Sequence, residues 1–411
     1  MPPEKIYHLI GIGIGPFNLG LAALCDELPE LNCLFIDQNE SFNWHPGMML
    51  PSARLQVPWY ADLVSLASPR SKFIYMNYLH ECSRKFRFAI TDHSFIKRKT
   101  YNDYCRWVCE QLPSLQFSTT CTSIEKENQF YRVKTNKGSF LTQKLILGTG
   151  TVPFIPEFGQ KPNQNILHSA NYLFRKEKLI NEPSITIIGS GQSAAEIFHD
   201  LLQCYSGKLS WFTRSARFYP MDYSKLTLEM STPEYIDYFY GLPDRKKKIV
   251  LAGQDALYKG INQSLISEIY DLIDEMDSPD KSLHTACELK KISADGLLTF
   301  LHTEEERTFS HKADAIILAT GYTAQVPECI KPIKRFIRLD SESLYKPHRN
   351  YSLDEENSIF IQNGEQQTHG FNAADLSLGP YRNAVILNTI LGYEHFRIEK
   401  GSTFQTFGLP K

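Results

Sequence analysis

One local pattern constrains the fold of this chain more than any other, and it opens the sequence. A short apolar strand is predicted at residues 7–10, a glycine-rich turn at 11–18 and a helix at 19–28. A second apolar strand follows at 33–36 and ends at Asp37. A strand, a tight turn, a helix and a second strand in this order predict a βαβ unit with parallel strands.

The same order returns about 175 residues later. A strand is predicted at 184–188, a second glycine-rich turn at 189–196, a helix to about Leu202 and a strand at 209–213. A chain of 411 residues is also long enough for two buried cores. The sequence therefore predicts an α/β fold with two Rossmann-like domains, each able to bind a dinucleotide.

The first glycine-rich turn matches a dinucleotide site imperfectly. Gly11, Gly13 and Gly15 allow a tight turn and a close approach of the backbone to a pyrophosphate. The third glycine of the standard pattern is Asn18 when counted from Gly13, or the adjacent proline when counted from Gly11. Asp37, 22 residues after Gly15, supports the assignment because its carboxylate can accept ribose hydroxyls.

The second turn carries a different charge after its second strand. Gly189, Gly191 and Ala194 form the motif, and Arg214 stands where an acid would select NAD. An arginine can pair with a 2'-phosphate, which favours NADPH over NADH, and Arg217 is a second candidate for this contact. Two such sites in one chain indicate electron transfer between dinucleotides, with FAD at the first and hydride delivered from the second.

Composition excludes several classes of protein. The net charge of -2 gives no basic excess for nucleic acid, and no run of about 20 apolar residues predicts a membrane span. The nine cysteines are scattered without a CxxC pair or zinc spacing. We therefore expect reduced thiols in a cytoplasmic protein, with neither a metal site nor a disulfide reductase activity.

The predicted domain order is discontinuous. Apolar runs at 145–150 and 315–322 end in small residues and are expected to be the crossing points between the modules. The expected division is a first part of the FAD-binding domain at 1–160, an NADPH-binding domain at 161–312 with a partly helical insertion at about 217–275, and a return at 313–411 to the FAD-binding domain and the substrate site.

Several further segments resemble one family in order along nearly the whole chain. They lie at residues 42–50, 55–57, 62–65, 73–79, 101–107, 189–196, 319–322, 367–370 and 376–378. Together they resemble the flavin-dependent N-hydroxylating monooxygenases of siderophore biosynthesis, which include the lysine and ornithine N-hydroxylases. Such an ordered set is more specific than either glycine motif.

The resemblance implies a reaction. NADPH would reduce FAD, O2 would add to form a C4a-hydroperoxyflavin, and a neutral primary amine would attack its distal oxygen. Gln56 and Asn262 are the expected catalytic residues. The residues expected to contact the cofactors are Gly11, Gly13, Gly15, Pro16, Asn18, Asp37, Gln38, Trp44, His45, Met48, Gln56, Gly189, Gly191, Gln192, Ser193, Glu196, Arg214, Thr320, Gly321, Tyr322 and Leu376.

One departure from the family bears on the substrate. The amino-acid hydroxylases carry a lysine for the substrate carboxylate just before an Asp-Leu pair, where this chain has Ala61. Burying an unpaired carboxylate is costly, so we expect a primary amine without one: putrescine, cadaverine or histamine. L-lysine or L-ornithine stays the alternative if another cation compensates; Arg54, Arg70 and Lys72 are the candidates. The expected substrate-binding residues are Ala61, Asn262, Asp375 and Ser377, whereas Asp62 is expected to be structural.

Two other functions remain open from the sequence. A Baeyer-Villiger or flavin-containing monooxygenase would use the same flavin chemistry on carbon or sulfur. A non-catalytic redox sensor would keep both nucleotide sites without hydroxylation. The resembled family also commonly forms dimers or tetramers, so a homo-oligomer is expected.

Overall fold

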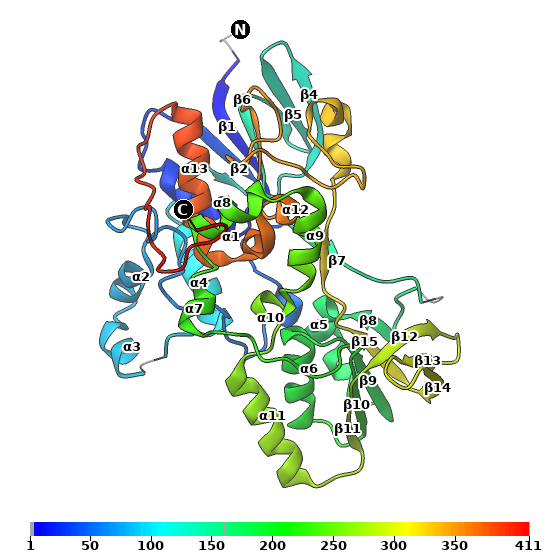
Figure 1. Cartoon of the computed structure of the whole chain (residues 1–411). Coiled ribbons are helices and arrows are strands. Elements are labelled where there is room, and N and C mark those ends of the chain that lie inside the picture. The colour runs from blue at the N-terminus through cyan, green and yellow to red at the C-terminus, as the bar shows by residue number, and fades with distance from the viewer. Residues whose placement is uncertain (1–3, 92, 159–160, 411) are drawn as a thin grey trace.

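A computed structural model describes residues 4–91, 93–158 and 161–410. The predicted boundary at residue 160 therefore touches residues outside the described ranges. The described residues form two main sheets and two small antiparallel sheets. Figure 1 shows the main sheets in separate lobes, with β7 running between them.

The first main sheet contains the N-terminal βαβ unit. Its order is β3-β2-β1-β6-β5-β4, with β17 paired to β6. Strands β1, β2, β3, β6 and β17 pair in parallel, while β4, β5 and β6 form an antiparallel meander. The strands are β1 (Ile6–Ile12), β2 (Cys33–Ile36), β3 (Leu115–Gln116), β4 (Cys121–Glu127), β5 (Phe130–Thr135), β6 (Gly138–Leu147) and β17 (Ile359–Ile361).

The bounds of two elements in the N-terminal βαβ unit differ from the prediction. β2 has the predicted bounds, but β1 continues through Gly11 to Ile12, and α1 (Pro16–Cys25) starts and stops three residues earlier than expected. Gly15 is the extended N-cap of α1 and Pro16 is its first residue. Proline suits this position because its fixed φ is helical and its missing N–H would have no partner there.

The second main sheet is entirely parallel and has the order β11-β10-β9-β15-β8. β9 (Ser184–Ile188) and the end of α6 (Gln192–Leu202) lie where the sequence predicted them, but α6 begins inside the predicted turn at 189–196, and β10 (Lys208–Phe212) is shifted by one residue. The remaining strands are β8 (Ile166–His168), β11 (Lys281–His284) and β15 (Ala315–Leu318). The apolar strands are buried between helix α6 and the three-stranded sheet, as parallel sheets require.

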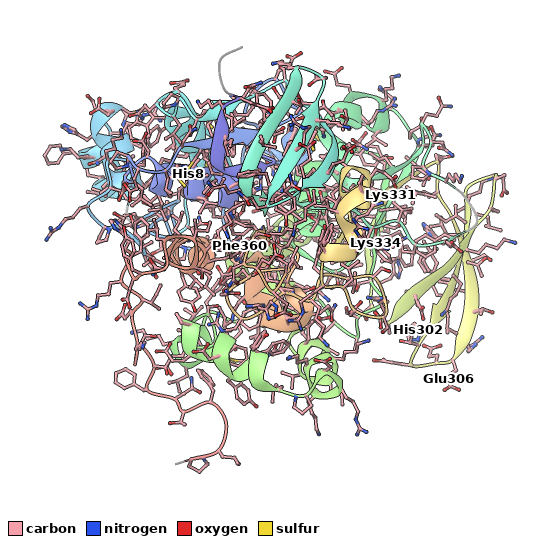
Figure 2. All side chains as sticks on the ribbon, turned by 90° about the horizontal axis from the view of Figure 1, so that it is seen from above. His8, His302, Glu306, Lys331, Lys334 and Phe360 are labelled. Carbon is pink, nitrogen blue, oxygen red and sulfur yellow. The ribbon has the colours of Figure 1, made fainter. Side chains whose placement is uncertain are left out.

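Two short strands join the lobes. β7 (Thr151–Pro153) and β16 (Tyr322–Ala324) follow the two apolar runs and pair with each other, antiparallel. An outlying sheet consists of β12 (Cys287–Ile292), β13 (Leu297–His302) and β14 (Arg307–Lys312). Figure 2 shows His302 and Glu306 on this outlying sheet, whereas Lys331 and Lys334 lie on η3 beside the first main sheet.

The segment predicted as a helical insertion contains five helices: α7 (Lys225–Leu228), α8 (Pro233–Gly241), α9 (Asp244–Ala252), α10 (Asp255–Tyr258) and α11 (Gln263–Met276). They divide between the lobes. α8 and α9 pack on α12 (Gln366–His369) and η4 (Gly370–Ala374) from the C-terminal region, while α11 packs on α6 (Figure 1). The insertion therefore covers both sides of the space between the main sheets.

The other helices complete the two lobes. They are α2 (Tyr75–Glu81), α3 (Lys85–Thr91), α4 (Arg98–Cys109), α5 (Tyr172–Leu179), α12 (Gln366–His369), α13 (Gly379–Leu391), η1 (Pro46–Met48), η2 (Ser169–Asn171), η3 (Glu328–Phe336), η4 (Gly370–Ala374) and η5 (Leu376–Leu378). Across the described ranges, every helix is too short or too polar to cross a membrane.

Candidate active site

A cavity of about 1340 Å³ extends across both lobes. Its wall includes the two glycine turns, the ends of β2 and β10, and the segment at 319–325 that returns between the lobes. The volume exceeds the roughly 300–1000 Å³ of a typical single-ligand site. The space is therefore suited to two dinucleotides placed end to end.

The first glycine turn presents bare backbone to this cavity. Gly13 has a φ of +88°, and a Cβ there would lie 2.4 Å from the carbonyl oxygen of Gly148. At Gly15 no atom lies within 4 Å of the position that a Cβ would take. Gly15 also caps the N-terminus of α1, where N–H groups and the helix dipole favour an anion. The turn thus fits a pyrophosphate.

Asn18 explains why the third glycine is absent. Its buried side chain donates to the carbonyl oxygen of Gly13 at 2.7 Å and accepts from Gln362 at 2.7 Å. It therefore ties the glycine turn to the residue that follows β17. A glycine at position 18 would leave these polar groups without their partner.

Asp37 also stabilises the turn. Its carboxylate accepts from the backbone N–H of Ile14 at 2.7 Å and from that of Asn39 at 2.8 Å. Two ionised oxygens have about four acceptor positions, so capacity remains for ribose hydroxyls. Asp37 and Gln38 both lie on the cavity wall.

The second glycine turn repeats this geometry. Gly189 has a φ of +145°, and a Cβ there would lie 2.2 Å from the carbonyl oxygen of Ala319. Gly191 is the extended N-cap of α6. Arg214 is exposed on the cavity wall at the end of β10, with Gln192 and Ser193 on the opposite side of the turn.

An aromatic wall lies between the two turns. Trp44 packs on Tyr101, and the Arg98 guanidinium lies 5.3 Å from the Trp44 ring centre. His45 contacts both Trp44 and Tyr322. The surrounding protein lowers the pKa of His45 to about 4, and Arg98 adds to this shift. His45 is therefore neutral near pH 7.

Most residues expected to contact the cofactors line the cavity, including Thr320, Gly321, Tyr322 and Leu376, but three lie behind its wall. Gly11 is inside β1, where a Cβ would collide with the Phe35 ring. Met48 is buried in the core of the second lobe. Glu196 is buried too, and pairs with Arg98 at 3.3 Å. These three can act on a cofactor only through their neighbours.

The two residues expected to be catalytic, Gln56 and Asn262, meet at Tyr223, which the sequence analysis missed. Of the residues expected near the substrate, Asn262, Asp375 and Ser377 are not among those that line the cavity. The Tyr223 hydroxyl donates to Oδ1 of Asn262 at 2.8 Å. Gln56 lies beside Tyr223, lines the cavity and donates to the carbonyl oxygen of Gly260 at 3.0 Å. Burial raises the pKa of Tyr223, with the charge of Asp375 adding to the effect.

Ser377 and Asp375 form a local pair at the start of η5. Asp375 accepts from both the backbone N–H of Ser377, at 2.9 Å, and its hydroxyl, at 2.7 Å. Asp375 stands between Ala374 and Leu376, which both line the cavity. The hydroxyl of Ser377 is thus engaged by Asp375, while the carboxylate keeps acceptor capacity.

Ala61 is buried, with 1% of its surface exposed, and does not line the cavity. The neighbouring Asp62 is structural, as expected: its carboxylate accepts from the backbone of Val64, Ser65 and Tyr75 and from the Ser65 hydroxyl. Burial raises the pKa of Asp62, and these hydrogen bonds oppose the shift.

Two further residues contribute to the cavity wall. Nε2 of His168 lies 3.0 Å from the carbonyl oxygen of Gly321 and supports the wall from behind. These two positions are 153 residues apart, so residue spacing could not have identified the contact. Lys259 lines the cavity and pairs with Asp255 at 2.8 Å; the two are four residues apart, a spacing that is typical of an ion pair on a helix.

Two glycine turns that open on one cavity define a flavin- and nicotinamide-dependent oxidoreductase. Residues 5–324 match the family described as L-lysine 6-monooxygenase/L-ornithine 5-monooxygenase, and the chain belongs to this family. It is therefore a flavin-dependent N-hydroxylating monooxygenase that uses FAD and NADPH with O2. This confirms the predicted class and cofactors.

Several relatives match over nearly the full chain. The chain is 43% identical to a putrescine N-hydroxylase of Shewanella oneidensis, covering 98% of this chain and 84% of the relative. It is 40% identical to a putrescine N-hydroxylase of Acinetobacter baumannii, covering 99% and 95%. A crystal structure of the FAD-bound cadaverine monooxygenase DfoA of Erwinia amylovora, from the desferrioxamine pathway, matches with 43% identity, a TM-score of 0.96 and coverage of 99% and 100%.

Proposed function

We propose that this enzyme N-hydroxylates one end of a small aliphatic diamine, putrescine or cadaverine, in siderophore biosynthesis. The observation that carries this proposal is Ala61, which provides no positive charge where the amino-acid hydroxylases carry a lysine. The names of the relatives at 40–43% identity support the same substrate class. Histamine stays a carboxylate-free alternative.

The three cations that could have replaced the missing lysine are placed unfavourably. Arg54 donates to the carbonyl oxygen of Phe95 at 2.9 Å, Lys72 pairs with Asp26 at 2.8 Å, and Arg70 is exposed. All three lie away from the cavity wall. None of these three cations is therefore placed to replace the missing lysine, and burying a carboxylate without a paired charge is unfavourable by several kcal/mol.

The residue roles follow from this placement. The turn at Gly13 and Gly15 would hold the FAD pyrophosphate and Asp37 its ribose, while Gly189, Gly191 and Arg214 would hold NADPH. FAD, once reduced by NADPH, supplies the activated oxygen. Trp44, His45 and Tyr322 would exclude water from this step, and neutral His45 would add no positive charge there at neutral pH.

The remaining assignments rest on the same resemblance. The first main sheet with its C-terminal return would be the FAD-binding domain, and the second main sheet the NADPH-binding domain. The enzyme would act in the cytoplasm as a dimer or tetramer. Sedimentation analysis of the purified protein tests the oligomer, and a monomer would refute it.

The substrate proposal is tested by assaying hydroxylamine formation with putrescine, cadaverine, histamine, ornithine and lysine. Diamines should give the highest kcat/KM. Ala61→Lys should raise the kcat/KM for ornithine relative to putrescine by roughly 10- to 100-fold, because a charge-assisted pair contributes about 1.5–3 kcal/mol.

Ala61→Met is the matched control, since it adds bulk without charge. It should not favour ornithine. A wild-type enzyme that prefers lysine or ornithine would refute the diamine proposal while leaving the family and its cofactors intact.

A further inference from the structure

The wall of the large cavity has few cationic side chains. Across residues 4–91, 93–158 and 161–410, the lysine and arginine residues that line it are Arg214 and Lys259. NADPH carries a pyrophosphate and a 2'-phosphate, and arginine and lysine are the usual counter-charges for such groups. Arg214, at the end of β10, is assigned to the 2'-phosphate. Lys259 is therefore the cation that is left for the pyrophosphate.

Lys259 lies beside the N-terminus of α6. It directly follows α10 (Asp255–Tyr258), and its carbonyl oxygen is 3.4 Å from the position that a Cβ on Gly191 would take. Gly191 is the N-cap of α6 and lines the same cavity. The N–H groups at the start of a helix after a glycine turn bind a pyrophosphate. Lys259 is thus on the wall where this group of a coenzyme at the second turn would lie.

The backbone next to Lys259 is fixed in place by two glutamines. The Gln56 amide donates to the carbonyl oxygen of Gly260 at 3.0 Å. The backbone N–H of Asn262 donates to Oε1 of Gln192 at 2.9 Å, and Gln192 is the first residue of α6. The segment that carries Lys259 is therefore docked on the second glycine turn, and only the lysine side chain has to move when it meets a ligand.

The Lys259 ammonium is charged and can exchange its partner. Burial lowers the pKa of Lys259, but the hydrogen bond to Asp255 and the neighbouring Tyr258 outweigh burial and raise it, so the group is a cation at neutral pH. Nζ pairs with Asp255 at 2.8 Å, and the two side chains are 53% and 57% exposed. An ion pair so exposed contributes little to stability. The ammonium can therefore leave Asp255 for a phosphate oxygen at small cost.

We propose that Lys259 binds the pyrophosphate of NADPH: its ammonium contacts a phosphate oxygen of the coenzyme held at the second glycine turn, while Arg214 contacts the 2'-phosphate. This inference rests on the proposed function, which places NADPH at that turn. The two cations then have different tasks. Lys259 contributes affinity for NADPH and NADH alike, because both contain the pyrophosphate, whereas Arg214 discriminates between them.

The test compares the full-length, FAD-loaded wild type with Lys259→Met and Arg214→Ala. Lys259→Met should raise the dissociation constants of NADP+ and NAD+ by the same factor, roughly three- to tenfold, as expected for one charge-assisted hydrogen bond at a half-exposed site. Calorimetry measures both constants, and the KM for NADPH and NADH should rise in parallel. The dissociation constant of FAD should not change.

Adenosine 2'-phosphate separates the two cations, because it has the 2'-phosphate but no pyrophosphate. Its dissociation constant should be unchanged in Lys259→Met and raised in Arg214→Ala. Lys259→Arg keeps the charge and should bind both coenzymes nearly as well as the wild type. Lys99→Met is the matched control: Lys99 forms an ion pair with Asp103 at the same four-residue spacing, is 68% exposed and does not line the cavity. It should behave as wild type.

Three results would overturn the inference. The first is a Lys259→Met enzyme that binds both coenzymes like Lys99→Met. The second is a loss that adenosine 2'-phosphate shares, which would place Lys259 at the other phosphate. The third is an equal loss in Lys259→Arg, which would make packing the cause.

Failure of the proposed placement of NADPH looks different. The dissociation constant of FAD would then rise in Lys259→Met, while that of NADP+ would stay the same. Melting temperatures of all variants show whether a loss of binding reflects a loss of folding.

Discussion

The two glycine turns have the same backbone geometry but are followed by residues of opposite charge. In each, the glycine after the first strand has a positive φ and leaves no room for a Cβ, because a carbonyl of the neighbouring strand end lies 2.2–2.4 Å from that position. After the second strand, the first turn has Asp37 and the second has Arg214. The two turns therefore share the steric requirement of a dinucleotide site, and we expect the charged residue after each second strand to discriminate between the dinucleotides.

Substitution of Gly13 and Gly189 should have the largest effects on the binding of the two cofactors. Gly13→Ala should abolish FAD retention, weakening it roughly 100-fold or more, because it adds both backbone strain and a collision. Gly189→Ala should leave the protein yellow but unable to oxidise NADPH. Flavin absorbance and NADPH oxidation measure the two effects.

Gly241→Ala is the control for both, since no atom lies within 4 Å of its Cβ position. If Gly13→Ala kept its flavin and Gly189→Ala lost it, the assignment of cofactors to turns would be reversed.

Removing the charge at the second site should have the next largest effect. Arg214→Ala should raise the KM for NADPH roughly 10- to 100-fold and leave that for NADH nearly unchanged, because only NADPH carries the 2'-phosphate. The ratio of kcat/KM for the two coenzymes measures this. Equal losses with both would show that Arg214 does not contact the phosphate; Arg217→Ala provides the neighbouring comparison.

Removing the negative charge of Asp37 at the first site should weaken cofactor binding by a smaller factor. Asp37→Asn keeps one oxygen for the N–H groups of Ile14 and Asn39 but loses the charge. We expect the dissociation constant of FAD to rise about three- to tenfold, equivalent to about 1 kcal/mol. Flavin fluorescence during dialysis measures it, and the KM for NADPH should not move. A shift confined to NADPH would contradict the assignment.

The two lobes should also differ slightly in how much folding stability they lose at low pH. His369, fully buried in the first lobe, has a pKa well below its usual value because of burial, with nearby Arg349 adding to the shift. The unfolded histidine binds a proton below about pH 6.5 while the folded one does not, so stability falls as the pH drops through this value. The loss is at most about 1.4 kcal/mol per pH unit for one such histidine.

Urea unfolding at pH 7.5, 6.5 and 5.5 checks this expectation. His369→Asn should show a smaller acid loss than the wild type, since it removes one titrating group. Burial also lowers the pKa of His168 in the second lobe, but its hydrogen bond to the Gly321 carbonyl oxygen opposes the shift, so His168→Asn should change the profile less. An identical pH profile for His369→Asn and the wild type would exclude His369 as the cause.

The local parts of the site could be predicted because they depend on neighbouring residues. The bounds of β2 and β9, the end of α6 and the charges at Asp37 and Arg214 all follow from patterns within about 35 residues. The start of α1 was wrong by three residues because Pro16 was read as part of the turn, although proline is well suited to begin a helix.

The substrate end could be predicted only in part. Gln56 was named from resemblance, and Asn262 and Asp375 as possible acceptors for a substrate ammonium, but nothing in the sequence connected Gln56 and Asn262 to Tyr223. Gln56 contacts Gly260 across 204 positions, and such a contact depends on how the lobes dock. Met48 was misplaced for the same reason: the packing of Gly47 against Ala170 places it in the core of the second lobe.

The sequence by itself determined the two turns, the charge that follows each and the missing lysine at Ala61, because backbone conformation and charge are properties of local residues. Only the tertiary structure decided which side chains face the cavity, which support it from behind and how Tyr223 meets Asn262. Those contacts join segments whose separation along the chain carries no information about their distance in space. They exist because the insertion packs on both lobes at once.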